Sequence, residues 1–211
     1  KETGMVYLVD DEPGMLRALT RLLAAEGFTV KSYRSAGDFL ADDQKDSRAC
    51  LVLDVAMPDL DGMTLQQRLA TRGSTLPVIF LTGHGDIAMS VRAIKLGAVD
   101  FLTKPVKAVE LLAAVRAALK IAGEQVAGRK ATVELRERLA SLTPREHEVM
   151  THVIAGGLNK QIAAALGIRE QTVKIHRMRV MEKLGLHSVV ELVHAAERLG
   201  VKPPDHRAKV E

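Results

Sequence analysis

Five short apolar runs alternate with helix-like segments in the first part of the chain, and this alternation restricts its fold more than any other feature. The runs are Met5–Val9, Phe28–Lys31, Cys50–Leu53, Pro77–Leu81 and Asp100–Thr103. Short apolar runs bounded by turn residues are typical of strands that are buried on both faces. Strands that alternate with helices form a parallel sheet with helices on both sides. We therefore predict a five-stranded parallel α/β domain over residues 1–121.

Polar side chains stand where these predicted strands end. Asp10 and Asp11 follow the first strand, Asp54 follows the third, Thr82 the fourth and Lys104 the fifth. Ligands of open parallel sheets bind just past the carboxyl ends of the strands, so these side chains should converge. Three carboxylates held together repel one another and need a cation, and hard oxygen ligands suit Mg²⁺. A carboxylate pair alone is more typical of solvated surface, so the prediction rests on the whole set.

The pattern over residues 4–121 resembles the receiver domain of two-component response regulators. The residues that carry the resemblance are Asp10-Asp11, Asp54, Met57-Pro58, Asp61-Gly62, Thr82-Gly83 and Lys104-Pro105. The resemblance implies a flavodoxin-like (CheY-like) fold, in which Asp54 accepts a phosphoryl group from the phosphohistidine of a sensor histidine kinase. It also implies that Asp11, Asp54 and the backbone carbonyl of Ala56 bind Mg²⁺ directly, with Asp10 acting mostly through water.

The same resemblance assigns the remaining roles in this domain. Lys104 supplies positive charge to the phosphoryl oxygens, and Thr82 donates a hydrogen bond to one of them. A cis peptide bond is expected between Lys104 and Pro105. Phe101 is either a switch residue, which turns inward behind Thr82, or a plain core residue. The helix at 86–96 and the last strand would form the dimer surface. The small side chain of Ala56 would leave the acyl phosphate open to water.

Helical spacing continues almost without interruption from Val106 to Ala140. We expect one apolar stripe of the last receiver helix to face the sheet, made of Val109, Leu112, Ala113, Val115, Leu119 and Ala122. Residues 122–140 then form a helical linker. The linker has too few heptad repeats, and these are too polar, to predict a coiled coil.

The second part of the chain is predicted to form a small all-α domain of four helices over residues 141–200. Thr143 and Glu146 predict a capping box at the first helix, and Ser188 and Glu191 predict another at the fourth. The second and third helices, separated by residues 167–169, form a helix-turn-helix candidate. Residues 201–211 are expected to be a disordered tail.

The predicted helix over 170–184 has two faces. Val173, His176, Val180 and Leu184 form an inward stripe, whereas the outward face consists of Gln171, Lys174, Ile175, Met178 and Glu182, flanked by Arg177 and Arg179. Such an outward face suits insertion into the DNA major groove. A solvated face of a helical bundle has the same pattern, so the pattern alone leaves both open.

Four segments resemble the LuxR/NarL-type DNA-binding domain, and with the receiver the chain is similar to the FixJ branch of response regulators. The segments are LTPREHEVM, NKQIAAALGI, TVKIHRMRVMEKL and ELVHAAERLG. The resemblance makes Lys174, Ile175 and Met178 the base-edge positions. It makes Thr172, His176, Arg177 and Arg179 mainly phosphate contacts and adds Lys160 as a further DNA-binding residue, although His176 fits a packing role equally well. Leu192 and Ala196 of the fourth helix would form a dimer surface.

This sequence departs from the second family pattern at two positions. Arg169 stands where a capping serine is usual, and Met178 is apolar where many members carry a basic residue. Base preference therefore cannot be transferred from the family.

Composition narrows the class of protein. Residues 1–120 hold equal numbers of basic and acidic residues, so the net charge of +4 lies in residues 121–211 and permits a nucleic-acid partner there. The low aromatic content disfavours a stacking platform for single strands. Cys50 is the only cysteine, no apolar run approaches membrane-spanning length, and no secretory signal opens the chain. We expect a cytoplasmic protein without membrane association.

The leading hypothesis is a transcription regulator, not a turnover enzyme. Phosphorylated, it would form a homodimer and bind double-stranded DNA at paired half-sites about one helical turn apart. A competing hypothesis is a phosphatase-like enzyme that uses Asp54 in an aspartyl-phosphate cycle, but residues 141–200 have no role in it. A third is a regulator that binds DNA without phosphorylation, which the complete acidic set disfavours.

Overall fold

The computed structural model describes residues 4–42, 48–83 and 87–204. The chain divides into two compact units, with the boundary between Ala127 and Gly128. Helix α5 (Ala108–Ala140) runs through the division between them. The predicted disordered tail falls mostly outside the described residues, and its first four residues have no regular structure. Within the described ranges, no helix is long and apolar enough to cross a membrane.

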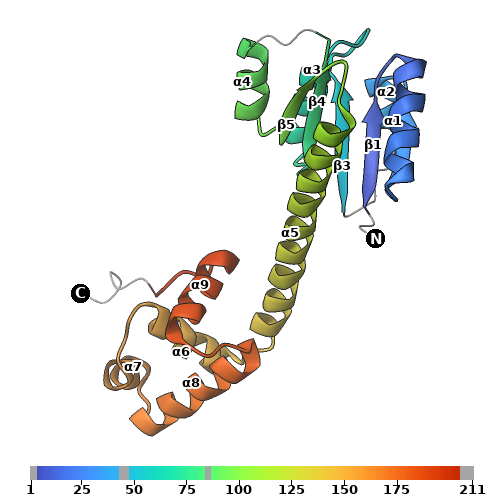
Figure 1. Cartoon of the computed structure of the whole chain (residues 1–211). Helices are drawn as coiled ribbons and strands as arrows, with labels where there is room; N and C mark the ends of the chain where they lie inside the picture. The colour runs from blue at the N-terminus through green and yellow to red at the C-terminus, as the bar shows by residue number, and fades with distance from the viewer. Residues whose placement is uncertain (1–3, 43–47, 84–86, 205–211) are drawn as a thin grey trace. The chain divides into compact units, whose positions relative to one another are not determined.

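The first unit is built on a five-stranded parallel sheet of order β2-β1-β3-β4-β5 (Figure 1). Its strands are β1 (Met5–Val9), β2 (Thr29–Tyr33), β3 (Ala49–Asp54), β4 (Val78–Thr82) and β5 (Asp100–Thr103). This confirms the predicted α/β class. Strand β2 begins one residue later than predicted, because the backbone of Phe28 closes the turn after α1 by donating a hydrogen bond to Leu23.

Helices cover both faces of the sheet, as the sequence predicted. Alternate residues of β1 point to opposite faces: Val6 and Leu8 pack with α1 (Pro13–Ala25) and α5, whereas Tyr7 and Val9 pack on the other side. That second face is covered by α2 (Ala36–Ala41), α3 (Gly62–Thr71) and α4 (Ile87–Lys95). The carboxyl ends of the strands are thereby left free of helices to carry a site.

The face of α5 that packs on the sheet differs from the predicted stripe. The buried residues are Leu111, Ala114, Val115, Ala118, Leu119 and Ala122. Val109 is 80% exposed and Ala113 is also exposed, so both were wrongly placed in the core. The observed set follows the alternating steps of three and one that keep residues on one helix face, whereas the predicted set mixed two faces.

The second unit packs four helices around one aliphatic core. These are α6 (Pro144–Ile154), α7 (Asn159–Leu166), α8 (Glu170–Leu184) and α9 (Val189–Leu199). The core includes Val149, Met150, Ile162, Val173, Val180, Leu184 and Leu192. The predicted capping box of Thr143 and Glu146 is present. At α9, the Ser188 side chain caps the helix, but the carboxylate of Glu191 accepts from the Ser188 hydroxyl and from the backbone nitrogen of His187, not from the backbone nitrogen of Ser188 as a capping box requires.

The prediction that Leu192 and Ala196 face a second copy was wrong. Both side chains are at most 4% exposed, because they are buried within the chain itself. The exposed apolar residues of α9 are Val189 and Val190, at its beginning.

Candidate functional site

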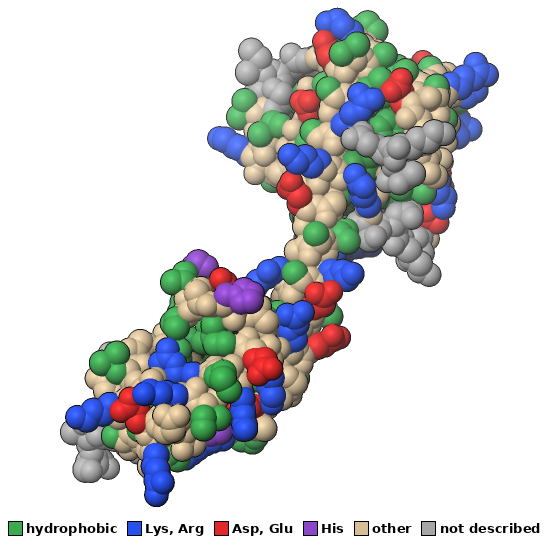
Figure 2. Space-filling view, turned by 60° about the horizontal axis from the view of Figure 1, so that its bottom comes forward, with side chains coloured by type: hydrophobic (Ala, Val, Ile, Leu, Met, Phe, Trp, Pro, Cys, Tyr) green, Lys and Arg blue, Asp and Glu red, His purple; other side chains and the backbone are tan. Residues whose placement is uncertain are grey.

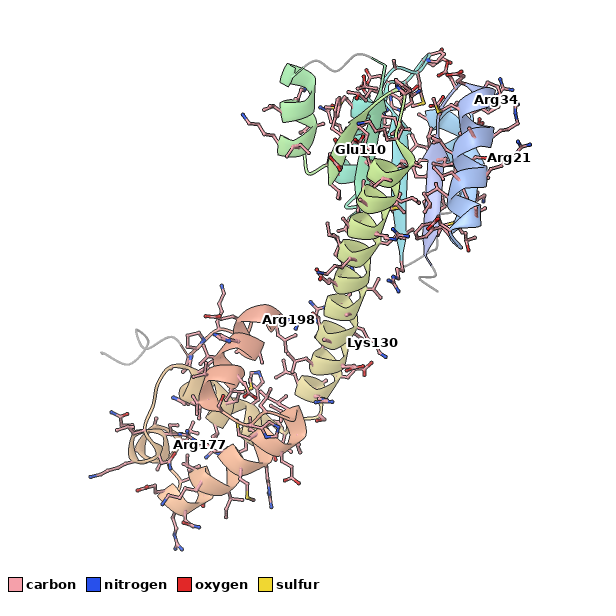
Figure 3. All side chains as sticks on the ribbon, in the orientation of Figure 1. Arg21, Arg34, Glu110, Lys130, Arg177 and Arg198 are labelled. Carbon is pink, nitrogen blue, oxygen red and sulfur yellow. The ribbon has the colours of Figure 1, made fainter. Side chains whose placement is uncertain are left out.

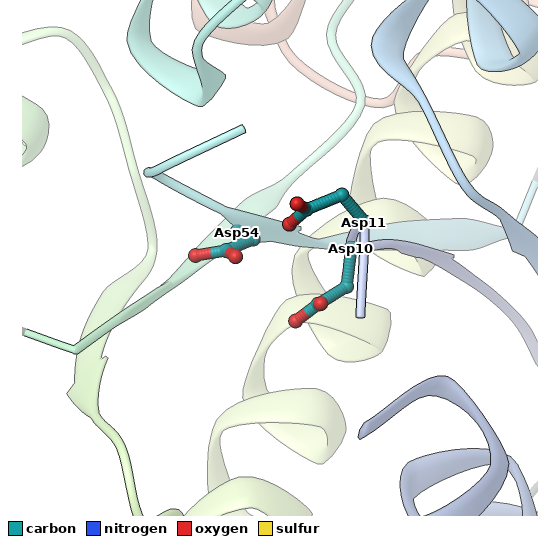
Figure 4. A group of neighbouring side chains, drawn as sticks. All are labelled: Asp10, Asp11 and Asp54. Carbon is teal, nitrogen blue, oxygen red and sulfur yellow. The ribbon is translucent and has the colours of Figure 1, made fainter. Parts of the chain in front are cut away.

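Three carboxylates meet at the carboxyl edge of the sheet in the first unit. Asp10 and Asp11 directly follow β1, and Asp54 is the last residue of β3, whose Leu53 pairs with Val9. One carboxylate oxygen from each of the three lies within 4.8 Å of the others (Figure 4). Asp10 and Asp54 are only 2% and 4% exposed. The parallel register thus brings together the predicted acidic residues from two neighbouring strands.

Lys104 reaches this acidic cluster from the end of β5. Its Nζ atom lies 2.7 Å from Oδ2 of Asp10 and 2.9 Å from Oδ2 of Asp54, and it donates a hydrogen bond to each. The peptide bond between Lys104 and Pro105 is cis, as predicted. Lys104 therefore offsets part of the negative charge that burial would otherwise make costly.

Burial and neighbouring charges act in opposite directions on the pKa of Asp54. Burial raises it, the hydrogen bond and charge of Lys104 lower it, the charge of Asp10 raises it again, and the net pKa lies above the ordinary value. For Lys104, burial lowers the pKa, but the hydrogen bonds to Asp10 and Asp54 outweigh it, so the net pKa is raised. The lysine is therefore charged at neutral pH.

The three carboxylates fit the donor set of a hard divalent cation. Each supplies an oxygen atom, and the three oxygens are close enough to bind one ion. Asp11 is less buried than its two neighbours, so the cluster opens to solvent on its side. This geometry leaves room for the waters that Mg²⁺ usually retains. The cluster could therefore hold a metal ion.

Thr82 and Phe101 lie on the strands beside the acidic cluster. Leu81 pairs in register with Asp54, so the buried Thr82 stands one residue further along β4. The backbone nitrogen of Lys104 donates to the carbonyl of Thr82 at 2.6 Å. Phe101 is half-buried, and its ring centroid lies 6.2 Å from that of Phe80. Phe101 thus packs against the core, and its switch role stays a prediction.

The loop after β3 wraps around Asp54. The backbone nitrogen of Ala56 donates to Oδ1 of Asp54 at 3.3 Å, and the side chain of Ala56 is exposed, as the predicted water access requires. Its carbonyl as a metal ligand stays a prediction. Asp59 adopts a left-handed conformation, with φ of 65°. An aspartate tolerates this better than most residues.

Gly62 is a positioning residue whose role the sequence did not reveal. A Cβ atom at this position would lie 2.3 Å from the carbonyl oxygen of Asp54. Its backbone nitrogen also donates to the carbonyl of Val55 at 3.0 Å. The sequence contained Gly62 as part of the Asp61-Gly62 pair, but only the fold brings the start of α3 this close to the end of β3.

In the second unit, the predicted outward face of α8 is exposed. Gln171, Lys174, Ile175, Met178 and Arg179 all face solvent, and Lys160 is exposed on α7. Arg169 occupies the position before α8 and makes no side-chain cap there, as expected from its departure from the usual serine. The side chains offered for nucleic-acid contact therefore come mainly from one helix.

Three predicted contact residues of α8 are half-buried instead, namely Thr172, His176 and Arg177. Arg177 donates to Oδ1 of Asn159 at 2.9 Å and so ties α8 to the start of α7 (Figure 3). Nδ1 of His176 is buried and has no hydrogen-bond partner among the described residues. The link between Arg177 and Asn159 was missed, because the two residues lie 18 positions apart on different helices.

Comparison with known proteins agrees with the division of the chain into two units. Residues 6–116 match the model of the response regulator receiver domain, and residues 140–196 match that of the luxR family of bacterial regulatory proteins. The response regulator protein TodT of Pseudomonas putida is 45% identical over 196 residues, which cover 93% of this chain and 86% of TodT. The transcriptional regulatory protein FixJ of Azorhizobium caulinodans is 40% identical over 204 residues, or 97% of each chain. The solved structure of the response regulator StyR aligns with a TM-score of 0.77 at 40% identity, covering 92% of this chain and 98% of StyR.

Proposed function

The chain belongs to the response regulators that join a receiver domain to a LuxR-type DNA-binding domain, and on this basis we propose that phosphorylation of Asp54 controls its binding to DNA. The family is one of transcriptional regulators of two-component systems, which implies a sensor kinase and DNA as partners. We assign residues 1–121 to the receiver, 122–140 to a helical linker and 141–200 to the DNA-binding domain. A cytoplasmic location follows from the DNA partner.

The observation that carries the proposal is the convergence of Asp10, Asp11 and Lys104 on Asp54. A carboxylate oxygen of Asp54 attacks the phosphorus atom of a phosphohistidine in the sensor kinase. An O–P bond forms, the P–N bond breaks, and the departing imidazole takes up a proton. Such transfer needs positioning and charge neutralisation more than acid–base chemistry.

The side chains around Asp54 have separate tasks in this scheme. Asp10, Asp11, Asp54 and the carbonyl of Ala56 would hold Mg²⁺, which would supply positive charge to the phosphoryl oxygens. The ammonium of Lys104 exchanges its contact with Asp54 for one with a phosphoryl oxygen. Thr82 follows Leu81, the residue that pairs with Asp54 across the sheet, and its hydroxyl donates a hydrogen bond to another phosphoryl oxygen.

To form this hydrogen bond, Thr82 moves toward the phosphoryl group, and the output follows from that movement. Phe101 turns into the space that Thr82 leaves, and α4 and β5 shift with it. The helix α4 exposes Val91 and Ile94, two apolar side chains that suit a contact with a second copy. We propose that the resulting homodimer places two α8 helices in the major grooves of paired half-sites. Lys174, Ile175 and Met178 face base edges, while Lys160, Thr172, His176, Arg177 and Arg179 bind the DNA backbone.

The alternative is an enzyme that turns over phosphorylated substrates through Asp54. An enzyme of this kind releases phosphate in many cycles, whereas a regulator accepts one phosphoryl group per molecule and loses it slowly. The second unit has no role in the enzyme scheme, so we favour the regulator.

Acetyl phosphate and Mg²⁺ provide the test. A duplex selected from a random pool by the treated full-length protein should bind the treated protein at least tenfold more tightly than the untreated one. The variant D54N should show no such increase, whereas D59N, which removes a charge from the neighbouring loop, should respond normally. Equal activation of D54N, or no change in the wild type, excludes the proposal. Sustained phosphate release over many cycles supports the enzyme instead.

A further inference from the structure

Two apolar side chains on the outward face of α8 are left uncovered. Ile175 is 38% exposed and Met178 is 60% exposed, and neither belongs to the core of the second unit. Because they are three residues apart on one helix, their side chains are neighbours on the same face. Packing within this chain therefore does not account for either residue.

The charges around this apolar pair indicate what covers it. Lys174 precedes Ile175, Arg179 follows Met178, and Lys160 and Arg169 are exposed on and after α7. The acids on α8 are Glu170, whose carboxylate lies 3.7 Å from Nζ of Lys174, and the exposed Glu182. Figure 2, which turns the bottom of Figure 1 forward, shows Lys and Arg side chains interspersed with hydrophobic ones over the second unit. A polyanion complements the excess of cations.

The DNA major groove offers both features that this face requires. Its rims carry phosphates for the cations. Among the base edges on its floor, thymine presents an apolar group, the 5-methyl, whereas the other bases present hydrogen-bonding atoms. Isoleucine has no hydrogen-bonding group with which to read those other edges, and methionine has only a weakly accepting thioether sulfur.

We infer that Ile175 and Met178 read thymine 5-methyl groups, an inference that rests on the proposed binding of α8 in the major groove. The two residues are separated by about 4.5 Å along the helix axis, at about 1.5 Å per residue. Base pairs are stacked about 3.4 Å apart. The two methyl groups therefore belong to neighbouring base pairs or to pairs one step further apart. The half-site contains at least two thymines within this short stretch.

Replacing thymine with uracil tests the inference at single-methyl resolution, because uracil keeps every hydrogen-bonding group. A duplex is first selected from a random pool by the full-length protein treated with acetyl phosphate and Mg²⁺. Each recurrent thymine of the half-site is then changed to uracil in turn. Two positions should each weaken wild-type binding about fourfold, which corresponds to about 0.8 kcal/mol for one buried methyl-sized group.

Protein variants assign each methyl to a side chain. I175A should lose the response to uracil at one of the two positions, and M178A at the other, while each keeps the response at its partner's position. Both residues are exposed, so these variants should fold, as the thermal unfolding of the second unit will verify. V190A is the matched control, because Val190 is 64% exposed but lies on α9; it should keep both responses.

The outcomes separate the inference from the proposed function. A selection that enriches no sequence overturns the proposed DNA binding, and the inference with it. An enriched duplex that tolerates uracil at every position, or variants that keep both responses, overturns the inference alone. Loss of one response per variant supports it.

Discussion

The two units carry their candidate sites in opposite ways. In the first, Asp10, Asp54 and Lys104 are up to 94 positions apart and meet at a buried edge of the sheet. In the second, the candidate DNA contacts lie mostly on α8 and face solvent. A site assembled from strand ends depends on the whole fold of its unit, whereas a helix face depends only on one helix being held in place.

Buried charge also has a different role in each unit. Asp10 and Asp54 are buried at the candidate site of the first unit. In the second, Glu146 is buried at the start of α6, where its carboxylate accepts from Lys183 Nζ at 2.6 Å and from the backbone of Thr143 at 2.9 Å. Glu146 thus links α6 to α8 through Lys183. It is not one of the residues on the outward face of α8. This difference can be tested by substitutions that separate stability from function.

The largest effect is expected for G62A. The added methyl group would lie 2.3 Å from the carbonyl oxygen of Asp54, a clash that only a movement of the backbone can relieve. We expect a loss of about 3 kcal/mol in the unfolding free energy of the first unit, measured by urea denaturation, together with loss of phosphorylation by acetyl phosphate. In G37A, the methyl group on α2 has as its nearest neighbour the hydroxyl oxygen of the preceding Ser35, at 3.6 Å. This control should be neutral or slightly stabilising. If G62A behaves like G37A, the dependence of the first site on backbone packing is refuted.

E146Q should produce the next largest effect, in the second unit. The hydrogen bond from Lys183, followed by those from Thr143, lowers the pKa of Glu146 from 4.5 to about 2. A lowered pKa stabilises the fold above pH 4.5, and this contribution is lost as pH falls from 4.5 toward 2. E146Q should cost about 2 kcal/mol at pH 7, and the difference from the wild type should shrink in acid.

Two measurements keep this second test decisive. E148Q, which breaks an exposed pair with Arg145, should change stability by less than about 0.5 kcal/mol. At pH 7 and low temperature, where both variants remain folded, E146Q should bind DNA as the wild type does. A pH-independent difference would show that Glu146 acts through something other than its charge.

Mg²⁺ should stabilise the first unit by a smaller amount. At a concentration ten times its dissociation constant, the ion adds about 1.4 kcal/mol to the unfolding free energy. The thermal midpoint of the first unit should therefore rise by several degrees, and D11N should remove most of this rise because it deletes one of the three clustered carboxylates. D59N is the control, and it should keep the response. An equal response in D11N would mean that the ion binds elsewhere.

K174A should have the smallest effect on stability. Lys174 is exposed and pairs only weakly with Glu170, so the unfolding free energy should change by less than about 0.5 kcal/mol. DNA affinity should nevertheless fall. A base-edge contact predicts a loss of about 1–3 kcal/mol that depends on sequence, whereas a phosphate contact predicts a uniform loss and a salt slope reduced by about one. A change in stability as large as that of E146Q would break the contrast between the two units.

Much of the fold could be predicted because its signals are local. The alternation of apolar runs with helical spacing predicted the parallel sheet, and the ends of the five predicted strands lie within two residues of the observed ends. The stripe of α5 was misread, since Val109 and Ala113 fit the spacing but face solvent. Leu192 and Ala196 were misassigned because an apolar residue on a helix can face the core or a partner, and spacing does not distinguish them.

The sequence by itself determined which residues end the strands and which helix carries an exposed basic and apolar face. It did so because strand and helix periodicity depend on neighbours in the chain. Only the tertiary structure decided that Lys104 bridges Asp10 and Asp54, that Gly62 must lack a side chain beside Asp54, and that Arg177 is tied to Asn159. These contacts join segments that are distant along the chain, and packing alone brings them within reach of one another.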